Sequence, residues 1–75
     1  MHVDIKIKIG QRIKELRKKL ELSQEALAYD AEVDRTYITD VENGRRNVSV
    51  EILEKIIAAL QVSISEFFNA KEFKK

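Results

Sequence analysis

The 75-residue sequence contains no cysteine and no proline, and only two glycines. Without cysteine, neither a disulfide nor a thiolate metal site can form, so stability must come from packed apolar side chains or from a second subunit. The lack of proline and glycine disfavours a turn-rich sheet, whereas the abundant Leu, Ile, Ala, Glu and Lys favour helices. We therefore predict an all-α fold, a compact five-helix bundle that forms a single domain over residues 1–75.

Groups that could carry out catalysis are also scarce. His2 is the only histidine, and no cysteine is present to share a metal site or a nucleophilic pair with it. No glycine-rich segment could cradle a phosphate, and the acids between residues 25 and 34 are better explained as surface and helix-end charges. We predict that the protein is not an enzyme and has no catalytic residue, no metal and no cofactor.

Long apolar runs are missing as well. No run approaches the roughly 18 residues of a membrane-spanning helix, and the N-terminus lacks the apolar block of a secretory signal. We expect a soluble, cytoplasmic protein without a membrane partner. The alternative is that the basic first helix lies on acidic membranes as an amphipathic anchor.

The net charge of +1 conceals an uneven distribution. Residues 1–20 hold seven Lys or Arg against two acids, a balance of +5, whereas residues 21–34 hold five acids and no base. Nucleic-acid binding requires only a local basic surface beside the element that reads the bases. A solvated lysine face on the first helix explains the same pattern.

Apolar spacing predicts helices over about residues 6–19, 24–31, 35–43, 50–60 and 64–69. The first stripe is Ile5, Ile9, Ile13, Leu16 and Leu20. Residues 3–9 also alternate like a strand, but no other segment alternates well enough to pair with them. Serines at positions 23, 49 and 63 can cap three of the helices, and we expect the tail over residues 70–75 to be frayed.

The helix over residues 35–43 has marked ends. Asp34 can cap its N-terminus, and Asn43-Gly44 can enter the left-handed conformation that closes a helix. Ile38 and Val41 share an inward side, which leaves a polar outward set. That set consists of Arg35, Thr36, Thr39 and Asp40. Such a helix can read base edges in a major groove, although an ordinary solvated face has the same appearance.

Several strings resemble the helix-turn-helix of the Cro and lambda-repressor type, also called the XRE family. They are LSQE at residues 22–25, Ala28, Val33, Ile38, VENG at residues 41–44 and VSISEFF at residues 62–68. Within that family, DRTYI at residues 34–38 and RRNVS at residues 45–49 are similar to the controller proteins of type II restriction-modification systems. Members commonly have glycine where this chain has Glu32, so either the turn differs or Glu32 bears a strain of roughly 1 to 2 kcal/mol.

The resemblance implies a lambda-repressor-like DNA-binding domain. The expected function is a sequence-specific transcriptional regulator that binds a near-palindromic double-stranded operator as a homodimer, and contacts RNA polymerase if it is an activator. We predict base reading by the outward set of the helix over residues 35–43, with Arg35 foremost. Contacts to the DNA backbone are predicted for Gln24, Tyr37, Arg45, Arg46 and Asn47. For Gln24 and Tyr37, the alternative is that they brace the recognition helix.

The fifth helix is the predicted dimer surface. Phe67 and Phe68 are adjacent and cannot easily face one small core together, so one of them, with Ile64, is expected to meet a second subunit. The alternative is that both tuck under the first helix. A different alternative for the whole chain is a phage-type repressor or an antitoxin-like regulator, whose fifth helix binds another protein.

Overall fold

The computed structural model describes residues 4–74, so His2 lies outside the described residues. The elements are α1 (Ile5–Lys19), α2 (Gln24–Ala31), α3 (Arg35–Glu42), α4 (Val50–Ala59), α5 (Ile64–Phe68) and the short 3-10 helix η1 (Lys71–Phe73). Over the described residues all regular structure is helical, which confirms the all-α prediction. Each α-helix begins and ends within one residue of its predicted bounds.

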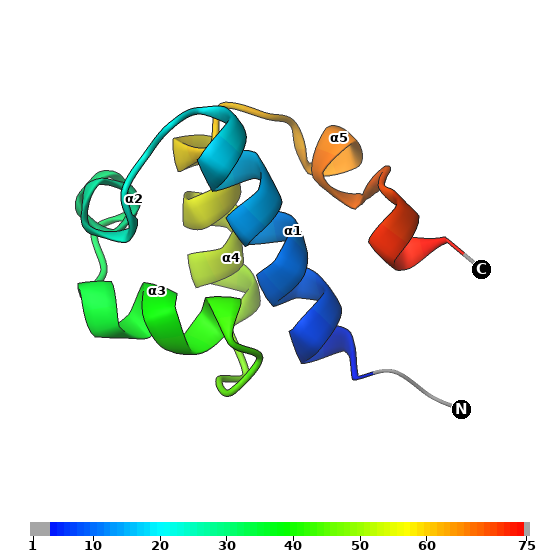
Figure 1. Cartoon of the computed structure of the whole chain (residues 1–75), viewed down its shortest axis with the longest axis horizontal. Helices are drawn as coiled ribbons and strands as arrows, with labels where there is room; N and C mark the ends of the chain where they lie inside the picture. The colour runs from blue at the N-terminus through cyan, green and yellow to red at the C-terminus, as the bar shows by residue number, and fades with distance from the viewer. Residues whose placement is uncertain (1–3, 75) are drawn as a thin grey trace.

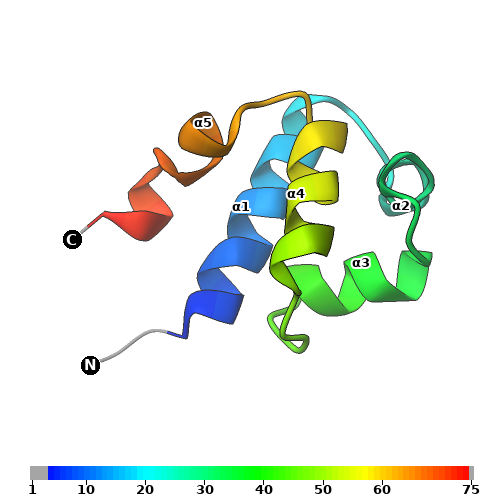
Figure 2. The ribbon, with the colours of Figure 1, turned by 180° about the vertical axis from the view of Figure 1, so that it is seen from behind.

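Two helices, α1 and α4, occupy the middle of the molecule in both ribbon views (Figures 1 and 2). On one side of this pair lie α2 and α3, with α3 running crosswise to α1 and α4 (Figure 1). α3 packs against α1 and α2, and α2 packs against α4. On the opposite side lie α5, which contacts α4, and η1, which contacts α1. The arrangement therefore separates the helix-turn-helix from the C-terminal segment.

The core is built from the inward stripes of these helices. Its fully buried side chains include Ile13, Leu27, Ile38, Ile56 and Phe67. The ends of the predicted α1 stripe are an exception, because Ile5 and Leu20 are exposed on the protomer. Ile13 and Leu16, in the middle of that stripe, are buried by other helices, whereas Ile7 on the same helix is 42% exposed.

Serine caps open three helices as predicted. The Oγ atoms of Ser23, Ser49 and Ser63 each accept a hydrogen bond from the backbone N–H three residues later, at 2.9, 3.1 and 3.0 Å. The predicted side-chain cap at Asp34 is wrong. Asp34 has the extended backbone of an N-cap, but its carboxylate makes no capping hydrogen bond and stays exposed, where water solvates its charge.

Three helices end in a left-handed residue that is not glycine. Glu21, Glu32 and Gln61 have φ values of 57°, 62° and 64°. After α2, the N–H of Val33 donates to the carbonyl of Ala28 at 2.9 Å, and the N–H of Glu32 donates to the carbonyl of Tyr29 at 3.1 Å. This is the bonding of a Schellman helix end. The turn between α2 and α3 is thus closed in the left-handed conformation, and Glu32 bears the strain that a glycine would avoid.

The C-terminal segment packs against the bundle, so the prediction of a frayed tail is wrong for residues 70–74. The Phe73 ring lies 4.9 Å from the Phe68 ring and 6.0 Å from the Phe67 ring, measured between centroids. The buried Arg12 of α1 donates to the carbonyls of Phe67 and Glu66 at 2.7 and 2.9 Å. Both carbonyls lie in the last turn of α5, where the Glu66 carbonyl also accepts from the N–H of Asn69 at 3.2 Å, and the guanidinium ties α5 to α1.

Candidate nucleic-acid interface

The exposed side of α3 carries the polar set that the sequence predicts for base reading. Arg35 and Thr36 are exposed in the first turn of the helix, while Thr39 and Asp40 are half-buried one turn later. On the opposite side of α3, Ile38 and Val41 are fully buried against the core. The helix is therefore fixed by its apolar side and presents hydrogen-bonding groups at its N-terminal end, which is the end that enters a major groove in this motif.

The loop after α3 folds back onto this surface through Arg46. The Arg46 guanidinium carbon lies 4.6 Å from the centre of the Tyr37 ring, and its Nη2 lies 3.6 Å from Asp40 Oδ2. Arg45 and Asn47 flank it and are exposed. Gly44 makes the turn into this loop with a φ of 73°, a conformation that favours glycine. Predicted base-reading and backbone residues thus meet in one cluster.

The inner side of α3 is held by a chain of polar contacts. The Glu42 carboxylate, whose side chain is only 2% exposed, accepts hydrogen bonds from Arg17 Nε at 2.6 Å and Arg17 Nη2 at 3.1 Å. It also accepts one from Gln24 Nε2 at 3.1 Å. Gln24 Oε1 in turn accepts a hydrogen bond from the Thr39 hydroxyl at 2.9 Å. Gln24 therefore braces α3 from α2, which is one of its two predicted roles.

Sequence reasoning missed the other members of this contact. Glu42 lies four residues after the inward Ile38, so its position on the helix predicts burial, but its partner Arg17 stands 25 residues earlier on a different helix. From the sequence alone, a glycine such as Gly10 inside a helix is expected only to weaken that helix. In the structure a Cβ on Gly10 would lie 2.3 Å from the carbonyl oxygen of Val41, so glycine is what allows α1 to approach the end of α3.

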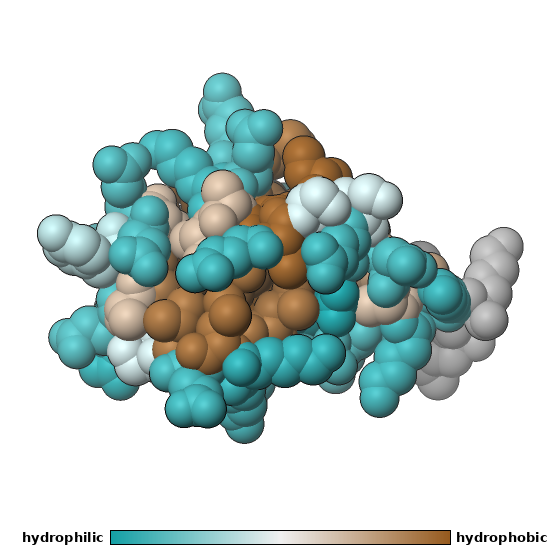
Figure 3. Space-filling view, turned by 90° about the horizontal axis from the view of Figure 1, so that it is seen from above, coloured by the Kyte–Doolittle hydropathy of each residue, from teal (hydrophilic) through white to brown (hydrophobic). Residues whose placement is uncertain are grey.

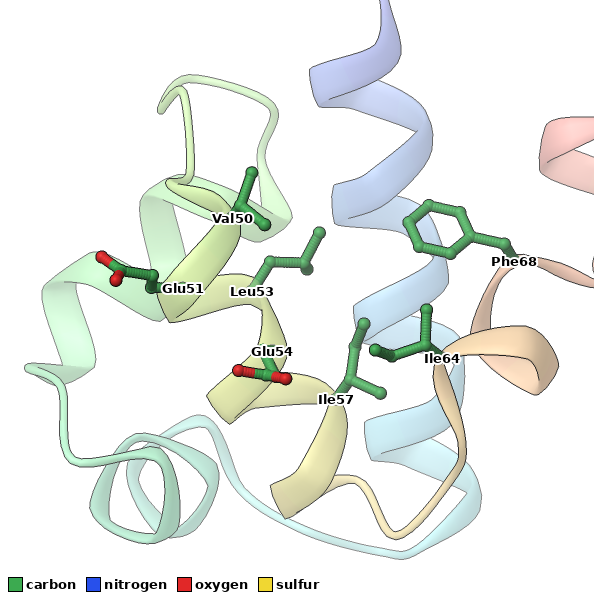
Figure 4. Close-up of a pocket in the computed structure, with 7 residues that line it drawn as sticks. All are labelled: Val50, Glu51, Leu53, Glu54, Ile57, Ile64 and Phe68. Carbon is green, nitrogen blue, oxygen red and sulfur yellow. The ribbon is translucent and has the colours of Figure 1, made fainter.

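A second surface of interest is apolar and lies between α4 and α5. It surrounds an open cavity of about 300 Å³. Val50, Leu53 and Ile57 of α4 face Ile64 and Phe68 of α5 across it, with Glu51 and Glu54 at its edge (Figure 4). Seen from above the view of Figure 1, the molecule also shows exposed apolar area with hydrophilic side chains around it (Figure 3).

The two adjacent phenylalanines differ sharply in exposure. Ile64 is 54% exposed and Phe68 is 37% exposed, whereas Phe67 is fully buried. Phe67 therefore belongs to the core, and Phe68 is the one of the two that is exposed beside Ile64. Successive side chains of a helix point about 100° apart, so with Phe67 in the core, Phe68 is turned towards the surface.

The described residues 4–74 contain no cluster of three or more His, Cys, Asp or Glu side chains placed to hold a metal ion. Within the same range, no helix combines the length and apolar character needed to cross a membrane.

Comparison with known proteins identifies the class of this chain. The helix-turn-helix family HTH_3 matches residues 13–67, a span that includes α2, α3 and the core of the bundle. The chain therefore belongs to this helix-turn-helix family.

Within the family, the chain groups with the control proteins of restriction-modification systems. It is 52% identical over 67 residues to the control protein C.MunI of a Mycoplasma species, covering 88% of this chain and 90% of that protein. It also matches the crystal structure of the restriction-modification controller protein C.AhdI from Aeromonas hydrophila, with 44% identity, a TM-score of 0.80, and coverage of 84% of this chain and 96% of the other. A tetramer of the controller C.Esp1396I in complex with its natural 35-base-pair operator matches with 37% identity, a TM-score of 0.89, and coverage of 99% and 100%.

Proposed function

We propose that this protein is a sequence-specific, DNA-binding transcriptional regulator of the restriction-modification controller type. The observation that carries the proposal is the two-sided α3, with Ile38 and Val41 fully buried and Arg35 and Thr36 exposed at its N-terminal end. The basic loop that contains Arg45 and Arg46 lies directly beyond it. The relatives support this function rather than a phage-type repressor or an antitoxin-like regulator, since the control protein C.MunI and the two controller structures match this chain over 90% or more of their own length.

The polar residues divide into two roles by position and chemistry. Arg35 is the foremost base-reading residue, because guanidinium matches the O6 and N7 acceptors of guanine, and Thr36, Thr39 and Asp40 are the further candidates at base edges. Arg45, Arg46 and Asn47 are placed in the loop, where arginine can grip phosphates, and Tyr37 lies beside them. An activator would in addition contact RNA polymerase. We expect the protein to act in the cytoplasm, where it would meet its operator.

The proposed active form is a homodimer joined through the apolar surface between α4 and α5. Ile64 and Phe68 are large apolar side chains that water contacts in the single chain, and covering them would stabilise a pair of subunits. A twofold axis would repeat α3 at an interval of about 34 Å, one turn of the duplex. This interval is the reason that the operator should be nearly palindromic.

Selection of duplexes from a randomised pool by the full chain tests this function. We expect enrichment of two inverted half-sites whose centres are roughly 10 base pairs apart. Competition with bulk DNA at fixed salt then measures the specificity ratio, because affinity alone depends strongly on salt. A pool without any enriched sequence, bound no better than bulk DNA, would rule out a sequence-specific regulator. Enrichment of single, unpaired half-sites would rule out the dimer.

A further inference from the structure

The polar chain behind α3 fixes the orientation of each of its members. Glu42 is buried and paired with Arg17, whose Nη1 also donates to the carbonyl of Leu22 at 2.8 Å. An ionised carboxylate has acceptors only. The Gln24 atom that lies 3.1 Å from Glu42 Oε1 must therefore be the amide nitrogen, because a carbonyl oxygen there would place two acceptors together.

The orientation of Gln24 then decides what faces Thr39. With its nitrogen turned to Glu42, Gln24 points Oε1 at the Thr39 hydroxyl, 2.9 Å away. The Thr39 hydroxyl has one hydrogen to donate, and two acceptors of the protein lie within hydrogen-bond distance of it. They are Gln24 Oε1 and the carbonyl oxygen of Arg35, the latter at 3.2 Å. The single proton of Thr39 is thus directed inward, and only lone pairs remain for a ligand on the outer side.

We propose that Glu42 and Gln24 are positioning residues that make the Thr39 hydroxyl an acceptor-only group, so that Thr39 selects a base presenting an N–H donor. In the major groove such donors are the N4 amino group of cytosine and the N6 amino group of adenine. Guanine O6 and N7 and thymine O4 are acceptors. Their lone pairs would face a lone pair of the Thr39 oxygen, with no hydrogen between them to form a hydrogen bond. This inference rests on the proposed function, since it assigns a preference at one base pair of the operator.

The test uses the operator enriched by the full chain, with single exocyclic amino groups removed. Adenine is replaced by purine, or cytosine by 2-pyrimidinone, one position at a time, and affinities are measured by gel-shift titration. At one base pair of each half-site, we expect loss of the amino group to weaken wild-type binding by about 2- to 10-fold, the range of one hydrogen bond. Thr39→Val, which keeps the shape and removes the hydroxyl, should show no such loss at that position.

Further variants separate positioning from structure. Thr39→Ser keeps the hydroxyl and should retain the sensitivity to the amino group. Gln24→Leu removes the shorter of the two inward acceptors and leaves only the Arg35 carbonyl at 3.2 Å, so we expect it to increase tolerance of guanine or thymine at the same base pair by a few fold. Gln11→Leu, an exposed glutamine on α1, is the matched control and should leave the base preference unchanged. Thermal unfolding of each variant shows whether a loss of binding comes from loss of the fold.

Each outcome bears on a different claim. If the chain enriches no sequence, the proposed function fails and the analogue experiment cannot begin. If an operator is found and no amino group shows coupling to Thr39, the acceptor assignment is overturned while the function stands. Coupling of Thr39 to guanine N7, detected with 7-deazaguanine, would show that the hydroxyl donates and would also overturn the assignment.

Discussion

Gly10 of α1 touches the last turn of α3 at the carbonyl of Val41. A Cβ on Gly10 would lie 2.3 Å from the oxygen of Val41 and 2.8 Å from that of Glu42. Both atoms belong to backbone, so neither can rotate away as a flexible side chain would. Two further residues of α1, one on each side of Gly10, contact the same region. Ile7 packs against Gly44, and Arg17 donates a hydrogen bond to Glu42. One face of α1 therefore sets where the end of α3 lies.

Gly10→Ala is expected to destabilise the protein in spite of its helix propensity. Alanine gains about 1 kcal/mol over glycine inside a helix. The added methyl group, however, forces α1 away from α3, and overpacking of this kind costs about 1 to 3 kcal/mol. We expect a net loss in the free energy of unfolding, measured by urea titration. Lys14→Ala on the exposed side of α1 is the control, and a Gly10→Ala variant more stable than wild type would contradict the close contact.

Local patterns in the sequence were sufficient for the helices and insufficient for the contacts between them. Serine caps and apolar spacing located all five α-helices, because these signals act within one or two turns. The close approach at Gly10 and the ion pair of Glu42 with Arg17 depend on partners on another helix, which no local pattern reveals. Arg12 and Phe73 both contact Phe67 and fix the rotation of α5, which places Phe67 inside and Phe68 outside. Arg12 precedes Phe67 by 55 residues, and Phe73 lies beyond the end of α5.

Glycine at the end of α2 should stabilise the fold. Glu32 adopts a left-handed conformation with φ 62° and ψ 40°, which costs a residue with a Cβ roughly 1 to 2 kcal/mol. Glu32→Gly removes this strain, but it also raises the conformational entropy of the unfolded chain and deletes an exposed ion pair with Lys55. We therefore expect the free energy of unfolding to rise by only about 0.5 to 1 kcal/mol. Thermal and urea unfolding measure it. Gln61→Gly repeats the test at the end of α4, and a loss of stability in both variants would contradict the strain.

Glu15 should make stability depend on acid. A hydrogen bond from Arg12 holds the pKa of the Glu15 carboxyl below its usual range, and the charge of Arg12 acts in the same direction. A folded-state pKa below the unfolded value of about 4.3 means that this stabilisation is present above that pH. It is lost as the pH falls through the lower folded-state value. We expect Glu15→Gln to lower the unfolding temperature at pH 7 and to differ little from wild type at strongly acidic pH, whereas Asp30→Asn on the exposed side of α2 serves as the control.

Arg35 and Arg46 should affect DNA binding in different ways. Arg35→Ala removes a base-reading guanidinium, so we expect relaxed discrimination at one base pair at a cost of about 1 to 3 kcal/mol. Arg46→Ala should weaken binding to all sequences alike and reduce the slope of affinity against salt by about one charge. Gel-shift titrations on matched and mismatched operators, at several salt concentrations, measure both. Unchanged discrimination after Arg35→Ala would remove Arg35 from the base-reading role.

The neighbouring phenylalanines of α5 offer a matched test of the dimer. Phe68 is partly exposed beside Ile64, so we expect Phe68→Ala and Ile64→Glu to leave the helical fold intact and to shift the protein from dimer to monomer. Phe67 is fully buried, and Phe67→Ala should instead destabilise the protomer by about 3 to 5 kcal/mol through the cavity that it leaves. Sedimentation velocity over a concentration series reports the association, and circular dichroism reports the fold. If Ile64→Glu and Phe68→Ala both remain dimeric at the concentration where wild type is half dissociated, the subunits must pair through a different surface, because a charge or a lost ring at a buried interface cannot be without effect.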